Sequence, residues 1–92
     1  MTRVSTLTGP SVILLAMRTY TVSCQWDAEV HVWYVAESDV PGLATEAPTL
    51  EALEAKLHRM IPELLELNTE LPPHQAIPFE LITHKHELAR RA

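Results

Sequence analysis

The sequence predicts an α+β fold of order β-β-β-α-β, in which one kinked amphipathic helix covers one face of a four-stranded sheet. Two stretches with a period of two residues, 20–26 and 30–36, predict a β-hairpin. A helical apolar pattern over 50–67 precedes a last strand at 77–83. Because such crossovers are right-handed, the last strand should lie parallel to the first, which gives the strand order 3-2-1-4.

The length of 92 residues allows one domain, which we expect over residues 17–83. Residues 1–16 show no sustained period, and we expect a dispensable arm that is flexible or non-native. Their apolar run, 11–16, is far too short to span a bilayer and shorter than the usual core of a secretory signal. A secretory signal is therefore the less favoured alternative, and we expect a cytoplasmic protein without membrane contact. Residues 84–92 should form a polar, solvated tail.

The second strand of the hairpin, 30–36, carries apolar residues on both faces. The alternation places Val32 and Tyr34 on one face and His31, Trp33 and Val35 on the other. The single helix cannot cover both faces of the sheet. We therefore predict that Trp33, His31 and Val35 form an interface with another protein chain. The alternative is that a loop or tail of the same chain covers this face.

Turn and capping residues mark the remaining elements. Pro41-Gly42 predicts a type II turn, after which residues 43–46 form a short edge strand. Thr49 should cap the helix, and Asn68 should end it. Pro62 removes one backbone hydrogen bond on the polar side and should bend a single continuous helix. Its apolar face should supply most of the core: Leu50, Leu53, Leu57, Met60, Ile61, Leu64, Leu65 and Leu67.

Composition and spacing exclude several kinds of site. With 7 basic and 12 acidic residues, the net charge of −5 argues against direct nucleic-acid binding, which needs a basic surface. The single cysteine, Cys24, excludes a disulfide framework and lies on an apolar strand face, so we expect a buried core thiol. The acidic residues near Asp39 match no calcium loop, and His84 with His86 lack nearby metal ligands. We therefore predict no catalytic residue, no metal site and no cofactor.

Specific motifs add a family resemblance. Val32–Ala36, then Asp39–Leu43, then Thr49–Ala52 resemble the hairpin, Pro-Gly turn and capped helix of HicB-like antitoxins, which have a truncated ribonuclease-H-like fold. Val22–Asp27 and Ile61–Leu65 are similar to a closer family of small bacterial proteins of unknown function. The resemblance covers about residues 18–83, so it implies that the 17–83 domain is HicB-like.

The resemblance implies a non-catalytic protein-binding module that sequesters a small basic toxin and forms a homodimer. Many HicB-like antitoxins add a DNA-binding domain after this one, and residues 84–92 are too short to be one. A magnesium-dependent nuclease would need carboxylates clustered on the first and fourth strands, where only Glu80 is offered. The alternatives are an orphan structural domain, or a small enzyme that uses Cys24 or a histidine.

Overall fold

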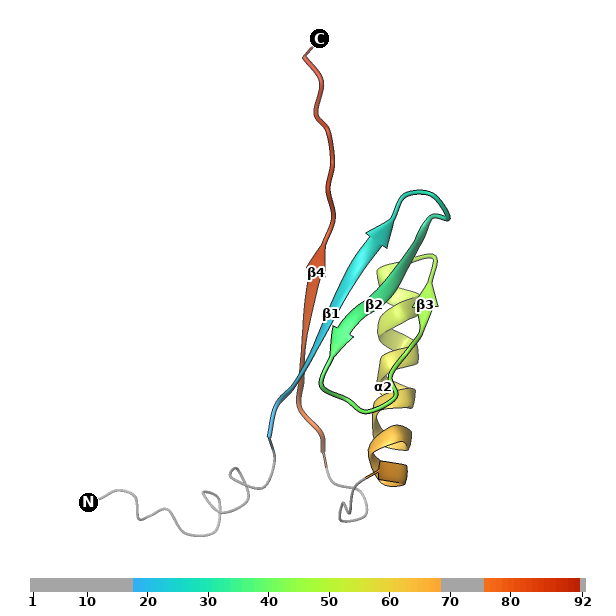
Figure 1. Cartoon of the computed structure of the whole chain (residues 1–92), viewed down its shortest axis with the longest axis vertical. Coiled ribbons are helices and arrows are strands. Elements are labelled where there is room, and N and C mark those ends of the chain that lie inside the picture. Colours follow the sequence, from blue (N-terminus) through green and yellow to red (C-terminus); the bar gives the residue numbers. More distant parts are fainter. Residues whose placement is uncertain (1–17, 69–75, 92) are drawn as a thin grey trace, which may run out of the picture.

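The computed structural model describes residues 18–68 and 76–91. The arm predicted at 1–16 lies outside the described residues. The five elements, in chain order, are β1 (Tyr20–Asp27), β2 (Val32–Ser38), β3 (Glu46–Ala47), α2 (Leu50–Asn68) and β4 (Phe79–His84). They form two layers, with α2 packed along one face of the sheet (Figure 1).

The sheet has the predicted topology. Its strand order is β3-β2-β1-β4, with β1 antiparallel to β2 and parallel to β4. The helix provides the crossover from β3 at one edge to β4 at the other (Figure 1). The α+β prediction of four strands and one helix is therefore confirmed. Among the described residues, no helix is long and apolar enough to cross a membrane.

The helix begins and ends where its capping residues predict. The Thr49 hydroxyl accepts a hydrogen bond from the Ala52 amide at 3.0 Å, and the Asn68 side chain donates to the Leu64 carbonyl at 2.8 Å. Pro62 lies within one continuous helix on its exposed side. Leu67 departs furthest from the predicted core, because it is 82% exposed near the end of the helix, and Leu50 and Met60 are only half-buried at its margin. The core joins α2 to the sheet through Leu53, Leu57, Ile61, Leu65, Tyr20, Val22, Cys24, Val40 and Ala47.

The hairpin register corrects our assignment of the faces of β2. The predicted strands, 20–26 and 30–36, left three residues for the turn between them, whereas the turn has four, Ala28 to His31. The His31 amide closes it by donating a hydrogen bond to the Asp27 carbonyl at 2.8 Å. His31 has a φ of 60°, which the end of this turn requires. One extra turn residue moves the side chains that follow, as far as Val35, to the opposite face of the sheet. Trp33 therefore pairs with Trp26 and lies on the helix side, opposite to our expectation.

The segment between β2 and α2 is mostly loop. Gly42 has a φ of +77°, as the predicted Pro41-Gly42 turn requires, and the Leu43 amide donates to the Val40 carbonyl at 3.2 Å. The third strand is shorter and later than the expected 43–46, because only Glu46 and Ala47 pair with β2. Val40 and Ala47 are buried, so this loop closes one end of the core.

Candidate functional site

The sheet has one face that no described element covers. We call the side of the sheet away from α2 the open face. The register of the strands places on it Thr21, Ser23, Gln25, Asp27, Val32, Tyr34, Glu37, Glu46, Glu80, Ile82 and His84. Most of these side chains are polar, and several are half-buried only by their neighbours in the sheet. The open face is therefore a surface on which a partner could bind a rigid element of this chain.

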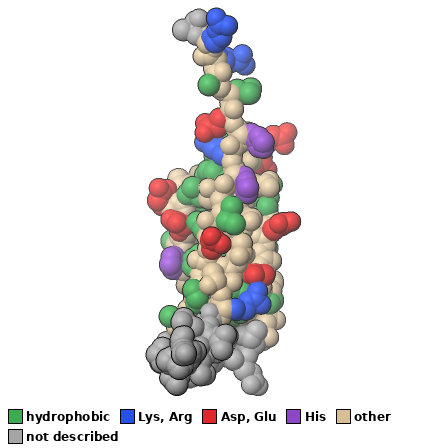
Figure 2. Space-filling model, turned by 90° about the vertical axis from the view of Figure 1, so that its left-hand side faces the viewer, with side chains coloured by type: hydrophobic (Ala, Val, Ile, Leu, Met, Phe, Trp, Pro, Cys, Tyr) green, Lys and Arg blue, Asp and Glu red, His purple; other side chains and the backbone are tan. Residues whose placement is uncertain are grey.

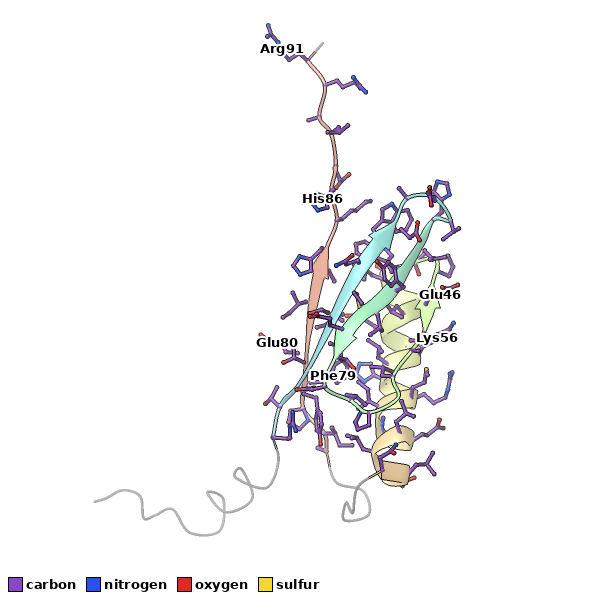
Figure 3. The ribbon with its side chains drawn as sticks, in the orientation of Figure 1. Glu46, Lys56, Phe79, Glu80, His86 and Arg91 are labelled. Carbon is purple, nitrogen blue, oxygen red and sulfur yellow. The ribbon has the colours of Figure 1, made fainter. Side chains whose placement is uncertain are left out.

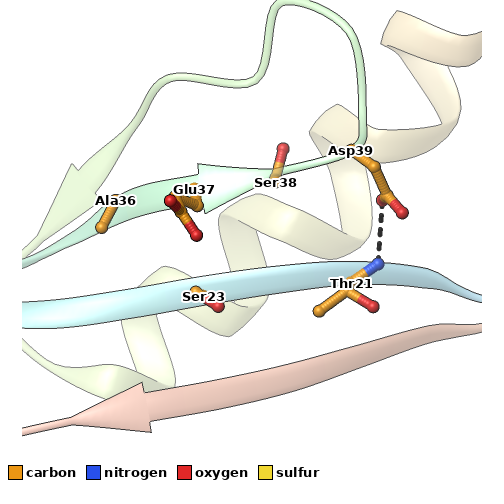
Figure 4. Close-up of a pocket in the computed structure, with 6 residues that line it drawn as sticks. All are labelled: Thr21, Ser23, Ala36, Glu37, Ser38 and Asp39. Atoms are coloured by element: carbon orange, nitrogen blue, oxygen red, sulfur yellow. Dashed lines mark hydrogen bonds between the residues drawn. The ribbon is translucent and has the colours of Figure 1, made fainter.

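An open depression of about 540 Å³ lies where β1 and the end of β2 diverge (Figure 4). Ala36 is the extra residue of a β-bulge in β2, because Glu37 pairs with Ser23 whereas Val35 pairs with Cys24. The bulge separates the strands and turns Glu37 toward Ser23 at the rim. The depression is lined by Thr21, Ser23, Ala36, Glu37, Ser38 and Asp39.

Asp39 fixes one end of this depression. Its carboxylate accepts hydrogen bonds from the Thr21 amide at 2.9 Å and from the Arg18 guanidinium at 2.8 Å. The Asp39 amide donates in return to the Thr21 carbonyl at 3.2 Å. The Thr21 amide, and after it the charge of Arg18, hold the pKa of this carboxyl below its ordinary value. Asp39 is thus a structural anion at the end of the sheet, and an anion so paired is a poor proton donor or acceptor near neutral pH.

The strands carry charge of one sign. In the four described strands there are four carboxylates, on Asp27, Glu37, Glu46 and Glu80, and neither lysine nor arginine. The pairing of the strands places all four on the open face, because residues paired across neighbouring strands share a face and the partners of all four lie on the open one. Asp27 is engaged in the turn, where its carboxylate accepts the Glu29 amide at 2.9 Å. The open face therefore presents negative charge around a polar centre.

The residues predicted as an interface lie together, but not on the open face. The Trp33 ring packs against the Trp26 ring at a tilt of 57° with the centroids 5.5 Å apart, and His31 meets Trp26 edge-on at 6.0 Å. Trp33 and Val35 are half-buried against the core, whereas His31 is exposed at the tip of the hairpin. Their role as an interface stays a prediction, and it now concerns the hairpin end of the helix side.

The candidates for nucleophilic or metal chemistry are dispersed. Cys24 is buried as expected, and burial raises the pKa of its thiol. The His58 ring packs edge-on against Phe79 at 5.3 Å. His84 and His86 line a small hollow at the end of β1. Among the described residues, no group of three histidine, cysteine, aspartate or glutamate side chains could hold a metal ion.

Sequence reasoning predicted that the helix leaves one face of the sheet uncovered, but it assigned the wrong residues of β2 to that face. The polar residues of β1 alternate with its core residues, so the period of two already identified Thr21, Ser23 and Gln25 as the uncovered side. The pairing of Glu37 and Glu80 beside them could not be read from one strand. It depends on the four-residue turn and on the parallel register of β4.

Comparisons with known proteins identify a family and assign no activity. The family described as Domain of unknown function (DUF1902) matches residues 19–91. The chain is also similar to the crystal structure of a hypothetical protein, TTHA1013, from the extremely thermophilic bacterium Thermus thermophilus. The two are 47% identical, with a TM-score of 0.55, over 80% of this chain and 100% of that one. No curated protein matches the chain.

Proposed function

Because the chain belongs to the DUF1902 family of domains of unknown function, we propose from its geometry that it is a non-catalytic module whose open face binds a small basic protein. The observation that carries the proposal is the charge of the strands, which present carboxylates and no basic side chain. Complementary charge steers a basic partner and fixes its orientation. Half-buried Tyr34, whose hydroxyl donates to the Gln25 side chain at 3.0 Å, adds a rigid aromatic contact at the centre.

The absence of enzymatic activity is part of the same proposal. A nucleophile must be exposed and activated by a neighbouring base. Cys24 is buried with a raised pKa, and His58 contacts an aromatic ring instead of a nucleophile. The carboxyl of Asp39 is held as an anion by the Thr21 amide and by Arg18. These environments favour binding over acid–base or covalent chemistry.

The partner class comes from the resemblance to HicB-like antitoxins. Those proteins sequester small basic toxins, and an acidic open face is suited to such a partner. The description of the family and the name of the protein in the similar crystal structure assign no activity, so the toxin assignment rests on the motifs of this chain and on its surface charge. The turn at Pro41-Gly42 and the cap at Thr49, two of the features on which the resemblance rests, are both present in the structure.

The test uses the small basic protein encoded beside this chain's gene, if there is one. We expect the two proteins to co-purify when they are co-expressed, and the chain to relieve any growth arrest that the neighbour causes. The variant Glu37→Lys/Glu46→Lys reverses two charges on the open face and should weaken the complex at least about tenfold. The control Glu63→Lys/Glu66→Lys makes the same charge change on the exposed side of α2 and should bind as the wild type does.

Three results would count against the proposal. A genomic neighbourhood without a small basic protein would remove the toxin assignment. Equal weakening by the two variants would mean that net charge alone, and not the open face, governs binding. A complex that survives the open-face reversal would place the partner elsewhere, with the hairpin end at Trp33 as the next surface to test.

A further inference from the structure

The two edges of the sheet are treated differently. At one edge, β3 is two residues long, and the Lys56 ammonium donates to the Glu46 carbonyl at 2.6 Å. At the other edge, β4 is six residues long, and residues 85–91 continue its line as an exposed extended segment (Figure 1). A long unprotected edge is a template for pairing with another strand, and proteins usually blunt such edges.

The backbone of β4 shows which of its groups reach the free edge. The Tyr20 amide donates to the Pro78 carbonyl at 3.0 Å, so the backbone groups of even-numbered β4 residues point toward β1. Those of Phe79, Leu81 and Thr83 therefore point away from the sheet. If the extended line continues, the same holds for Lys85, Glu87 and the odd-numbered residues beyond. This edge offers a row of amides and carbonyls at every second residue.

Along this edge the types of side chain are arranged almost symmetrically about Lys85. His84 and His86 flank it, Ile82 and Leu88 follow, and the next pair on the same face is acidic on one side and basic on the other, Glu80 and Arg90. We propose that β4 and residues 85–91 pair antiparallel with the same segment of a second copy, about a two-fold axis at Lys85.

This pairing matches side chains and backbone at once. In it Glu80 faces Arg90 of the second copy, and Ile82 faces Leu88. These even-numbered pairs are the ones without backbone hydrogen bonds, where the side chains of antiparallel strands come closest. The odd-numbered residues, whose backbone groups face outward, supply the hydrogen bonds. The match gives a partner to Ile82 and Leu88, which are 36% and 87% exposed in one chain.

Neighbouring registers lose this match. An axis at His84 would set Glu80 opposite Leu88 and Ile82 opposite His86. An axis at His86 would set Ile82 opposite Arg90. Each leaves an apolar side chain against a polar or charged one, although the odd-numbered residues would still pair with one another and could form the same kind of backbone hydrogen bonds. The Lys85 axis is therefore favoured over these two by the side chains, because it alone matches apolar with apolar and acidic with basic residues.

Two features of the structure favour this arrangement. The Lys85 ammonium lies 5.0 Å from the centre of the Trp26 ring, which draws it toward β1 and away from its symmetry mate on the axis. In Figure 2, which faces the β4 edge, hydrophobic and then basic side chains follow one another along the projecting segment, while acidic ones flank the body below. Figure 3 shows the span from Glu80 on the sheet to Arg91 at the tip. Glu80, Ile82 and His84 belong to the open face as well, but the pairing does not require that a basic partner binds the rest of that face.

A charge-swap series on the full chain tests the pairing. We expect the wild type to sediment as a dimer. Arg90→Glu places two carboxylates opposite each other in both symmetric pairs, and Glu80→Arg does the same with two cations. Each should raise the dimer dissociation constant roughly tenfold. The double variant Glu80→Arg/Arg90→Glu restores opposite charges and should return the dissociation constant to within about threefold of the wild type.

A second pair of variants tests the backbone contacts. Glu87→Pro removes an amide that points toward the second copy, whereas Glu87→Ala keeps that amide and removes only the side chain. We expect the proline variant to be monomeric at concentrations where the alanine variant remains a dimer. Residue 87 lies beyond β4 and is exposed, so both variants should melt like the wild-type fold.

The outcomes separate the alternatives. A monomeric wild type at about 100 µM, well above the usual range of specific dimers, would overturn the proposal. So would a dimer that neither the charge swap nor Glu87→Pro affects, because its interface would lie elsewhere. Loss of the dimer in Trp33→Ala with no effect of Glu87→Pro would move the interface to the hairpin end. Failure to bind a basic protein at the open face leaves these measurements unchanged, so the two proposals fail separately.

Discussion

On the covered face of β1, Val22 and Cys24 have no exposed surface, whereas one residue away on the open face Ser23 is half-buried and Gln25 is exposed. The same backbone carries both sets, and only α2 distinguishes them. The one helix of the described residues can bury only one face of the sheet, so stability should reside on the helix side. The opposite side is then available for recognition without cost to the core.

The sharpest difference between the faces should be in thiol reactivity. Cys24 is buried and its pKa is raised, so a thiol reagent should reach it only when the structure opens. In the variant Ser23→Cys/Cys24→Ser, the thiol moves to the open face and should react about a thousandfold faster. Stopped-flow labelling of both native proteins measures the ratio. Complete reaction of wild-type Cys24 within seconds would contradict the covered face.

Truncation of the core should separate the faces in stability. Leu57 lies on α2 and is fully buried in the core, so Leu57→Ala should lower the free energy of unfolding by about 3 kcal/mol. Val32 lies half-buried on the open face, and Val32→Ala should cost less than about 1 kcal/mol. Urea denaturation of the two variants gives both values. Similar losses would mean that the open face is itself covered in solution.

Trp33 tests the corrected register. It packs on Trp26 on the helix side, so Trp33→Ala should lower the free energy of unfolding by about 2 kcal/mol. Thermal melting measures this loss, and sedimentation of the same variant tests the predicted interface of Trp33, His31 and Val35. An unchanged melting temperature with lost self-association would favour the interface over the core.

The smallest effect should come from Asp39 at the end of the open face. Its pKa is lower in the folded chain than its ordinary value of 3.8, so its contribution is full above about pH 5 and is lost as the pH falls through the folded pKa. Asp39→Asn should therefore flatten the acid decline of the melting temperature slightly. Glu63→Gln, at an exposed site on α2, is the control and should retain the wild-type decline. If the melting temperature of Asp39→Asn falls with pH as that of the wild type does, the bonds of Asp39 to Thr21 and Arg18 do not stabilise the fold.

Local chemistry was enough to predict the elements and their order. The cap at Thr49, the turn at Pro41-Gly42 and the end at Asn68 each depend on residues within a few positions, and the structure confirms all three. The period of 3.6 placed Leu53 and Leu57 in the core, because helical neighbours are set by sequence distance alone. The handedness of the crossover then gave the strand order.

The assignment of faces in β2 needed the tertiary structure. A strand has a period of two, so a turn longer by one residue exchanges its two faces without changing any local propensity. The turn that ends at His31 placed Trp33 under the helix and Tyr34 on the open face. The bulge at Ala36 then brought Glu37 beside Ser23.

The sequence by itself determined the α+β class, the helix with its core residues and the strand order of this protein. The tertiary structure alone decided which face of β2 meets the helix, how short β3 is, and that no other described strand pairs with the outer edge of β4. The physical reason is range. Helical contacts and caps are fixed within about four residues along the chain, whereas strand register and edge exposure depend on pairing between segments tens of residues apart.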